Sequence, residues 1–376
     1  MTDTLWVLVT LPGALLWILI LLLPSRPWST REHLEADPHE PGGDLSAVTV
    51  LIPARNERAT IGRTLAALRR QHPALRVVVV DDRSEDGPAD EAGSSGLSRL
   101  RMIAGLPLPS GWTGKLWALE QGLAEIGTPQ VLLLDADIEI AAGIVPRMIE
   151  TKERLGVNLL SLMATLRGHG FWEQLLLPAF VYFFKLLYPF RLANSPSRLV
   201  AAAAGGCMLA DTNTLRSIGG FASIRAELID DCALARRVKD SGRLTWLGLS
   251  RSVTSHRHYN GLSGIWQMVS RTAYTQLRYS PPLLALCAAL LAAAFWLPVA
   301  ALFAPVVAAR WLAAIGLTAM VLAYLPMLRF YRLSPLWAML LPLTGTLYLA
   351  MTLDSARRYY LGRRSSWRGR EYGSEI

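Results

Sequence analysis

The chain has 376 residues and a formal net charge of +9, and hydrophobic residues make up 52% of it. A mean hydropathy of +0.30 is too apolar for a purely soluble enzyme, so membrane spans are expected. Cys207, Cys232 and Cys287 are widely spaced without metal-binding spacing, which indicates free thiols in a cytoplasmic domain.

The chain begins with an apolar run, residues 5–23, that contains no charge. About 20 apolar residues suffice to cross a hydrocarbon core of about 30 Å. No Lys or Arg precedes the run and no small-residue cleavage site follows it, which favours a retained anchor (residues 1–24) over a signal peptide. A linker rich in Pro, Gly and charge follows at residues 25–46, and its Arg26 and Arg31 place the next domain in the cytoplasm.

Residues 47–280 carry most of the charge and are expected to form one α/β domain. Apolar, β-branched runs alternate there with amphipathic segments, which predicts a mostly parallel, Rossmann-like sheet with helices on both faces. The expected strands are residues 47–54, 75–80, 100–103, 131–134 and 158–165, and the expected helices are residues 59–71, 115–126 and 143–154.

Polar residues stand directly after three of these strands. Ligands of parallel sheets bind beyond the carboxyl ends of the strands, so a nucleotide is expected at these residues. The chain has neither a G-x-G-x-x-G after the first strand nor a complete G-x-x-x-x-G-K-[ST], which argues against a dinucleotide dehydrogenase and a P-loop NTPase. The polar residues are Arg55, Glu57, Asp81, Asp82, Asp135 and Asp137.

The pair Asp135 and Asp137 follows a buried strand in "VLLLDADIEI". Two carboxylates at this spacing can share Mg²⁺ or Mn²⁺, which takes oxygen ligands and leaves positions for substrate phosphate oxygens. The pair therefore predicts a divalent metal site, and an ordinary turn or helix cap is the alternative.

Other candidate site residues can either bind the expected nucleotide or have an ordinary structural role. Asp81 or Asp82 can accept from a uracil imide N–H or cap the next helix, and Glu57 can accept from ribose hydroxyls. Lys115 opens a helix whose free N–H groups and ammonium can hold a diphosphate, but it can also be an ordinary solvated lysine.

A second acidic pair, Asp230 and Asp231, precedes a helix, so it is either an N-cap or the source of a general base. Gly205-Gly206 allows the backbone to approach a sugar closely, or two helices to pack closely. His256 and His258 alternate as on a strand, and Arg271 can meet a leaving diphosphate.

The segment of residues 170–190 is apolar and aromatic, and Pro178 interrupts it. We expect it to lie in the membrane interface, with a buried core helix as the alternative. An interfacial element would bring the domain to the bilayer, so the expected acceptor is a lipid.

The C-terminal third holds three more candidate spans, residues 283–308, 311–328 and 336–353, within a region of residues 281–354. Their prolines indicate kinks. The tail, residues 355–376, is rich in arginine and should face the cytoplasm, whereas three spans would put it outside. Either one stretch is re-entrant or the charge rule is broken.

Several motifs together resemble family 2 glycosyltransferases of the GT-A fold across about residues 46–275. These are "VTVLIPARNE", "VVVVDDRSEDG", "LLLDADI", "GGCMLADTNTLRSIGGF" and "IDDCALARRVKDSG". The stretch "GLPLPSGWTGKLWALEQG" and the flanking spans are similar to membrane-bound hopene-associated glycosyltransferases, which are relatives of ceramide glucosyltransferase.

The resemblance implies an inverting transfer from a nucleotide-sugar, with UDP as the expected nucleotide. It implies that Asp135 and Asp137 serve Mg²⁺ or Mn²⁺ and the diphosphate, and that Asp231 is the base next to Asp230. The implied donor-binding residues are Pro53, Arg55, Glu57, Asp81, Asp82, Lys115, Asp135, Gly206 and Arg271.

The family's Q-x-x-R-W motif is broken, because Gln267 and Arg271 are one residue too far apart and Thr272 replaces Trp. This departure argues against polymer synthesis.

The sequence thus predicts a multi-pass enzyme of the bacterial inner membrane with a cytoplasmic catalytic domain. It transfers one sugar to a lipid hydroxyl, with a hopanoid as the suggested lipid, and no nucleic-acid partner is expected. A polyprenyl-phosphate sugar transferase and a catalytically silent membrane scaffold are the alternatives.

Overall fold

The computed structural model describes residues 2–37, 43–87, 93, 95–362, 366–367 and 370–371. The chain divides into two compact units. The helical unit consists of Met1–Arg31, Gly168–Pro189 and Tyr259–Arg364, and the sheet unit consists of Glu32–Arg167, Phe190–His258 and Ser365–Ile376. This division places 168–189 and 259–280 with the helices, whereas the sequence grouped them with the catalytic domain; the domain boundaries stay a prediction.

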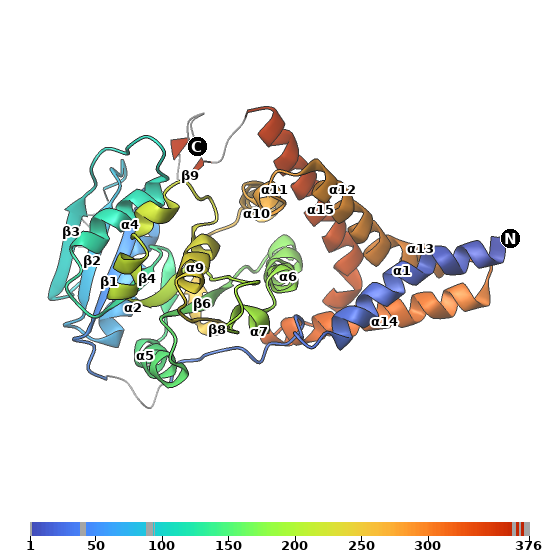
Figure 1. The fold of residues 1–376 in the computed structure, drawn as a ribbon, viewed down its shortest axis with the longest axis horizontal. Helices are drawn as coiled ribbons and strands as arrows, with labels where there is room; N and C mark the ends of the chain where they lie inside the picture. The colour runs from blue at the N-terminus through green and yellow to red at the C-terminus, as the bar shows by residue number, and fades with distance from the viewer. Residues whose placement is uncertain are drawn as a thin grey trace. The chain divides into compact units, whose positions relative to one another are not determined.

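An eight-stranded sheet forms the core of the sheet unit, with strand order β3-β2-β1-β4-β7-β6-β8-β5 (Figure 1). All five strands expected from apolar runs are present. The strands are β1 (Val48–Ala54), β2 (Arg76–Asp81), β3 (Arg99–Ala104), β4 (Gln130–Leu134), β5 (Ile138–Ile140), β6 (Leu159–Leu166), β7 (Cys207–Asp211) and β8 (Thr245–Ser255). A short pair, β9 (Ser366–Trp367) and β10 (Arg370–Glu371), lies near the C-terminus.

The sheet is mixed rather than mostly parallel, so that part of the fold prediction is wrong. β7 runs antiparallel to both of its neighbours, β4 and β6, and β5 runs antiparallel to β8. Residues 167–206, which include two helices, connect β6 to β7, so this connection is not the single-helix crossover that the predicted strand–helix alternation implies. A fully buried strand has the same apolar pattern in either direction, so the sequence does not reveal its orientation.

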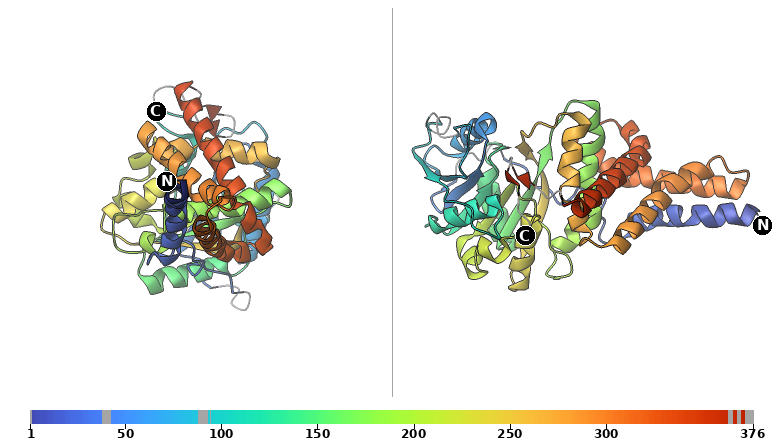
Figure 2. Two further views of the ribbon diagram at one scale, coloured as in Figure 1. Left: turned by 90° about the vertical axis from the view of Figure 1, so that its right-hand side faces the viewer. Right: turned by 90° about the horizontal axis from the view of Figure 1, so that it is seen from above.

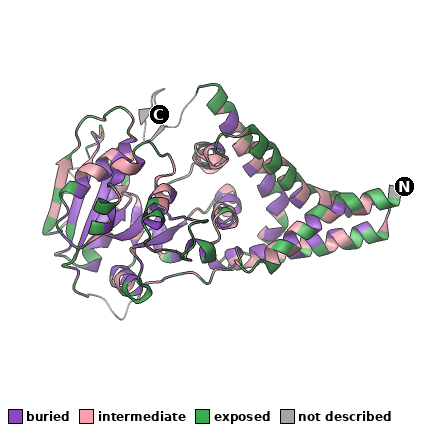
Figure 3. Ribbon diagram, in the orientation of Figure 1, coloured by how far each residue is buried: buried purple, intermediate pink, exposed green. Residues whose placement is uncertain are grey.

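Helices cover the two faces of the sheet, as predicted. On one face α2 (Arg58–Gln71) and α5 (Ile144–Leu155) bury apolar side chains against β1, β2 and β4. On the other face α4 (Gly114–Ala124) and α9 (Asp230–Asp240) pack against alternate residues of the same strands. The strands are therefore buried on both sides, which explains their unbroken apolar runs (Figure 3). The short α8 (Thr212–Ser217) and 3₁₀ helix η1 (Phe221–Ile224) connect β7 to α9.

The helical unit contains four helices that are long and apolar enough to cross a membrane. They are Asp3–Leu22, Pro281–Ala301, Val307–Phe330 and Pro335–Tyr360. The second comprises α12 (Pro281–Leu291), a π-helical turn η2 (Ala292–Trp296) and α13 (Leu297–Ala301), and the fourth comprises η3 (Pro335–Leu340) and α15 (Leu341–Tyr360). Large apolar side chains such as Leu19, Leu286 and Ile315 are exposed on these helices, as expected for surfaces that contact lipid tails.

The N-terminal helix α1 (Thr2–Leu22) packs beside α14 (Val307–Phe330) and against η2 (Figures 1 and 2). Pro298 has no N–H to offer the carbonyl of Ala294, four residues earlier. The indole Nε1 of the buried Trp17 donates to that carbonyl at 2.7 Å. The N-terminal helix thus satisfies a polar group that the proline frees inside an apolar bundle.

The segment predicted to be interfacial forms α6 (Phe171–Leu187), with Pro178 inside the helix. It packs against α10 (Gly261–Ser270), α14 and α15, and many of its side chains, including Glu173 and Lys185, are buried within the helical unit. Its interfacial role stays a prediction. The remaining short helices are α7 (Phe190–Ala193) and α11 (Ala273–Gln276).

Candidate active site

Two predicted carboxylates from distant parts of the chain meet at one predicted lysine. Lys115 lies in the first turn of α4, Asp135 follows β4, and Asp230 is the first residue of α9. The Nζ atom of Lys115 lies 2.9 Å from Asp135 Oδ1 and 3.3 Å from Asp230 Oδ2. The strand end and two helix starts therefore place a cation between two carboxylates at the carboxyl edge of the sheet.

Asp231 borders the same cluster. Its Oδ2 accepts a hydrogen bond from the Gly205 N–H at 2.8 Å, and its Oδ1 accepts from the Cys232 N–H at 2.7 Å. A Cβ atom on Gly205 would lie 3.3 Å from Lys115 Nζ, so glycine lets the backbone approach the lysine here. The carbonyl of Gly206 accepts from the Asp135 N–H at 3.1 Å. Through these two hydrogen bonds the Gly205-Gly206 pair contacts both Asp231 and the residue Asp135 that follows β4.

Burial and charge act against each other in this cluster. Burial lowers the pKa of Lys115, but the carboxylates of Asp135 and Asp230 outweigh that effect, and the net pKa is raised. Burial raises the pKa of Asp135, the cation of Lys115 opposes this, and repulsion from Asp137 adds to the rise. Lys115 therefore stays protonated. An additional cation would relieve the repulsion between the carboxylates of Asp135 and Asp137.

Asp231 has the properties of a proton acceptor. Burial raises its pKa to about 6, with a further contribution from the neighbouring Asp230 charge. The Lys115 cation and the two backbone N–H donors act in the opposite direction. A carboxylate with this pKa is ionised at neutral pH and is more basic than an exposed aspartate, as general-base catalysis requires.

The residues around Asp137 fit a divalent metal that also binds substrate. Ser255 Oγ donates to Asp137 Oδ2 at 3.0 Å, which orients that carboxylate. Within the described ranges, no group of three or more His, Cys, Asp or Glu side chains is arranged to hold a metal ion. Mg²⁺ and Mn²⁺ often use only one or two protein carboxylates and take their other ligands from phosphates and water, so Asp135 and Asp137 match that pattern.

Sequence patterns missed a network next to Asp137. His256 Nε2 lies 2.5 Å from Glu139 Oε2, and Arg70 donates to Glu139 Oε1 at 2.7 Å. Burial alone would raise the pKa of Glu139, but the contacts with His256 and Arg70 lower it.

β8 ends at Ser255, so the prediction that His256 and His258 lie on a strand is wrong. The His256 N–H still donates to the Asp137 carbonyl at 2.8 Å, and this bond joins the residue after β8 to the residue before β5.

Hydrogen bonds join the loop after β1 to the loop after β2 at the carboxyl edge of the sheet. Arg55 Nη1 donates to the Asp82 carbonyl at 2.6 Å, although the Nε atom of this buried side chain has no partner. Asp81 Oδ1 accepts from the Ser84 N–H at 3.0 Å, and Glu57 Oε2 accepts from Thr60 Oγ1 at 2.7 Å. The two loops thus form a preorganised polar surface. Pro53 pairs with Val80 inside the sheet just before that surface.

Arg271 is assigned to a different compact unit from the other candidate site residues. It belongs to the helical unit, where it follows α10 and its N–H donates to the Gln267 carbonyl at 3.2 Å. Its predicted contact with a leaving diphosphate stays a prediction.

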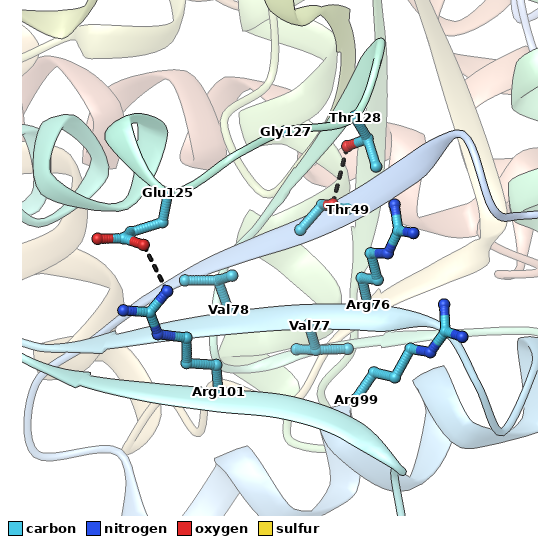
Figure 4. A pocket seen from close by; sticks show the side chains of 9 residues that line it. All are labelled: Thr49, Arg76, Val77, Val78, Arg99, Arg101, Glu125, Gly127 and Thr128. Carbon is cyan, nitrogen blue, oxygen red and sulfur yellow. Dashed lines mark hydrogen bonds and ion pairs between the residues drawn. The ribbon is translucent and has the colours of Figure 1, made fainter.

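A cavity of about 290 Å³ lies at the opposite, amino edge of β1–β3 (Figure 4). Arg76, Arg99 and Arg101 line it, and Arg101 pairs with Glu125. Ligands of this sheet class bind at the carboxyl edge, so the cavity is separate from the carboxylate cluster.

Residues 49–219 match the family described as Glycosyl transferase family 2. These residues form a family 2 glycosyltransferase domain. The family part of the resemblance is thereby confirmed, whereas the hopene-associated or ceramide glucosyltransferase subgroup is not.

Similar proteins include 4,4'-diaponeurosporenoate glycosyltransferase from Staphylococcus aureus, at 34% identity over 92 residues. That match spans 24% of this chain and only 24% of the relative. A mannosyltransferase from Pyrobaculum calidifontis, solved in complex with GDP-Man and Mn²⁺, shares the fold with a TM-score of 0.54 and 17% identity. It is matched over 97% of this chain and 100% of that chain. Glucosyl-3-phosphoglycerate synthase from Mycobacterium tuberculosis is more distant, with a TM-score of 0.41, 19% identity, and coverage of 65% of this chain and 86% of that chain.

Proposed function

We propose that this protein is an inverting glycosyltransferase that moves one sugar from a nucleotide-sugar to a hydroxyl group of a membrane lipid. The observation that carries the proposal is the meeting of Lys115, Asp135, Asp230 and Asp231 at the carboxyl edge of the sheet. This cluster lies in a glycosyltransferase domain whose chain also holds four candidate membrane spans.

The donor is proposed to bind along the loops that follow β1, β2 and β4. Asp81 or Asp82 accepts from the base, Glu57 accepts from the ribose, and Arg55 holds the loop that carries Asp82. Lys115, the free N–H groups of α4 and the backbone at Gly206 bind the diphosphate. UDP is the proposed nucleotide; the Pyrobaculum structure contains GDP-Man, so both nucleotides belong in the test.

Asp135 and Asp137 are proposed to hold Mg²⁺ or Mn²⁺. When bound, the metal would neutralise charge on the departing diphosphate. The support within this chain is the repulsion between the two carboxylates and the orientation of Asp137 by Ser255. Mn²⁺ is present in the Pyrobaculum mannosyltransferase structure.

The proposed base is Asp231 rather than Asp230. Asp230 forms an ion pair with Lys115, whose Nζ atom lies 3.3 Å from Asp230 Oδ2, so this carboxylate is already engaged by the lysine. Asp231 is held in place by two backbone N–H donors and keeps a raised pKa. It would remove the acceptor's proton as the hydroxyl oxygen attacks the sugar carbon and the nucleoside diphosphate leaves.

A membrane lipid is proposed as the acceptor because the same chain carries four apolar helices and the aromatic helix α6. A hopanoid is the specific suggestion, and the proposed location is the bacterial inner membrane with the sheet unit in the cytoplasm. The name of the Staphylococcus aureus relative describes a glycosyltransferase for 4,4'-diaponeurosporenoate, so this compound should be among the acceptors tested.

The test measures sugar transfer by the purified, detergent-solubilised chain from radiolabelled UDP- and GDP-sugars to lipid extracts. The Asp231→Asn variant should bind the nucleotide diphosphate normally and lose transfer by about 10²–10⁴-fold, the usual contribution of a general base. The matched control is Asp240→Asn, which removes an exposed carboxylate at the other end of α9 and should change neither property. Unchanged transfer in Asp231→Asn would disprove the base assignment, and a loss of only about tenfold would favour a phosphate acceptor, which needs no base.

A further inference from the structure

The path of the last apolar segment decides on which side of the membrane the basic tail lies. Arg357 and Arg358 end α15, and further arginines follow at positions 363, 364, 368 and 370 of the sequence. Three successive crossings after the sheet unit would put this charge on the side opposite Arg26 and Arg31. Contacts within the helical unit lead to a different path.

α12–α13 and α14 form an antiparallel pair. Only residues 302–306 separate the two, and α13 packs against α14. A Cβ atom on Gly13 would touch Ala293 and Pro298, and Trp17 bonds Ala294, so α1 runs antiparallel to α13 and therefore parallel to α14. The start of α12, the end of α14 and the end of α1 consequently lie on one side of the bundle.

The end of α15 lies on that same side. The rings of Tyr359 and Tyr279 stack with centroids 4.5 Å apart, and the hydroxyl groups of Tyr360 and Tyr274 are 3.0 Å apart. The Ser355 Oγ atom accepts from the Tyr274 N–H at 3.0 Å. Because Tyr279 stands two residues before α12, the last turns of α15 contact the place where α12 begins.

The beginning of α15 lies deeper in the bundle. After α14 the chain turns back, and η3 packs along α14. Thr346 Oγ1 then accepts from Trp296 Nε1 at 2.7 Å, and a Cβ atom on Gly345 would lie 2.5 Å from the Phe295 ring. From this level, far along the α12–α13 span, α15 descends antiparallel to α12 until it reaches Tyr279.

We propose that residues 331–360 enter the membrane and return to the side from which they came, so that α1, α12–α13 and α14 cross and α15 does not. The arginine-rich end then lies on the side where the chain leaves α1 toward the sheet unit. This inference does not depend on the proposed enzymatic activity.

The residues at the end of α15 fit the headgroup region of an anionic leaflet. Tyr359 and Tyr360 are 49% and 64% exposed, and tyrosine is enriched where a membrane meets water. Asp354 is neutralised by Arg358 at 2.8 Å and also accepts from Trp266 Nε1 at 2.8 Å. The basic residues that remain are attracted to anionic lipid, and they follow the bias that keeps arginine on the cytoplasmic side.

Cysteine accessibility in oriented membrane vesicles tests the path directly. Cys207 and Cys232 are buried and Cys287 lies in α12, so the unaltered chain serves as the unlabelled background for a membrane-impermeant maleimide. Single variants Ser25→Cys, Phe303→Cys and Leu361→Cys report the end of α1, the turn between α13 and α14, and the end of α15. Phe303 and Leu361 are 84% and 58% exposed, so these substitutions should not disturb packing.

Leu361→Cys should label from the same side as Ser25→Cys, whereas Phe303→Cys should label only from the other side. Labelling of Leu361→Cys together with Phe303→Cys, or its protection from both sides, would overturn the proposal. A C-terminal epitope tag on the otherwise unaltered chain provides a second readout, because protease should remove it from the same side as Ser25→Cys labelling.

Discussion

At the scale of single residues, Lys115 is the centre of the proposed donor site. It joins carboxylates that belong to β4 and α9, and its pKa is raised once burial is outweighed by those charges. A permanently charged ammonium at the start of a helix is suited to bind a diphosphate, which would compete with the carboxylates for it.

The Lys115→Met variant should bind UDP or GDP with Mn²⁺ about 10-fold to 150-fold more weakly, since a hydrogen bond to a charged group contributes about 1.5–3 kcal/mol. Titration calorimetry measures this change. Arg101→Met is the control, because Arg101 lines the cavity at the opposite edge of the same sheet. Equal nucleotide affinity in wild type and Lys115→Met would show that the lysine only stabilises the fold.

The pKa of Asp231 predicts a pH dependence of transfer. The base is active when ionised, so kcat/KM should rise as pH increases through about 6 and then level off. The groups that face Asp231 are Asp230, Lys115 and the Cys232 thiol, and the Asp230 charge raises its pKa. In Asp230→Asn the acidic limb should therefore move to lower pH. A limb that stays in place or moves upward would contradict the assignment.

At the scale of elements, the sequence predicted more about which strands exist than about how they run. β1, β2 and β4 follow from unbroken apolar runs, and their polar ends identified Arg55, Asp82 and Asp135 as site candidates. The antiparallel direction of β7 was missed, because a buried strand carries no directional signal. Ser255 and Glu139 were missed because they reach Asp137 and His256 through contacts over 100 residues away in the chain, which no local pattern encodes.

The contact between α1 and η2 gives a stability prediction. Trp17→Phe keeps the aromatic ring but leaves the Ala294 carbonyl without its indole donor in an apolar bundle. We expect a loss of about 1–2 kcal/mol in the free energy of unfolding and a lower Tm in detergent. Trp311→Phe, at an exposed position on α14, is the control and should leave Tm unchanged. Identical Tm values for the two variants would argue against the role of this hydrogen bond.

At the scale of the whole molecule, one chain combines a glycosyltransferase domain with four helices that are long and apolar enough to cross a membrane. The sequence could predict this combination because both signals are local: charged residues after apolar strands, and long runs without charge. It could not predict the path of α15, because that path depends on contacts such as Tyr279 with Tyr359, which join distant segments.

The central claim is that acidic residues far apart in the chain surround one metal-bound nucleotide-sugar at the carboxyl edge of the sheet. Its most direct test is a structure of the full chain with Mn²⁺ and a nucleoside diphosphate, in which anomalous scattering locates the manganese. We predict manganese density at Asp135 and Asp137 with the diphosphate beside Lys115, and loss of that density in Asp137→Ala. Manganese and nucleotide bound elsewhere, for example in the arginine-lined cavity at Arg76 and Arg99, would contradict the account.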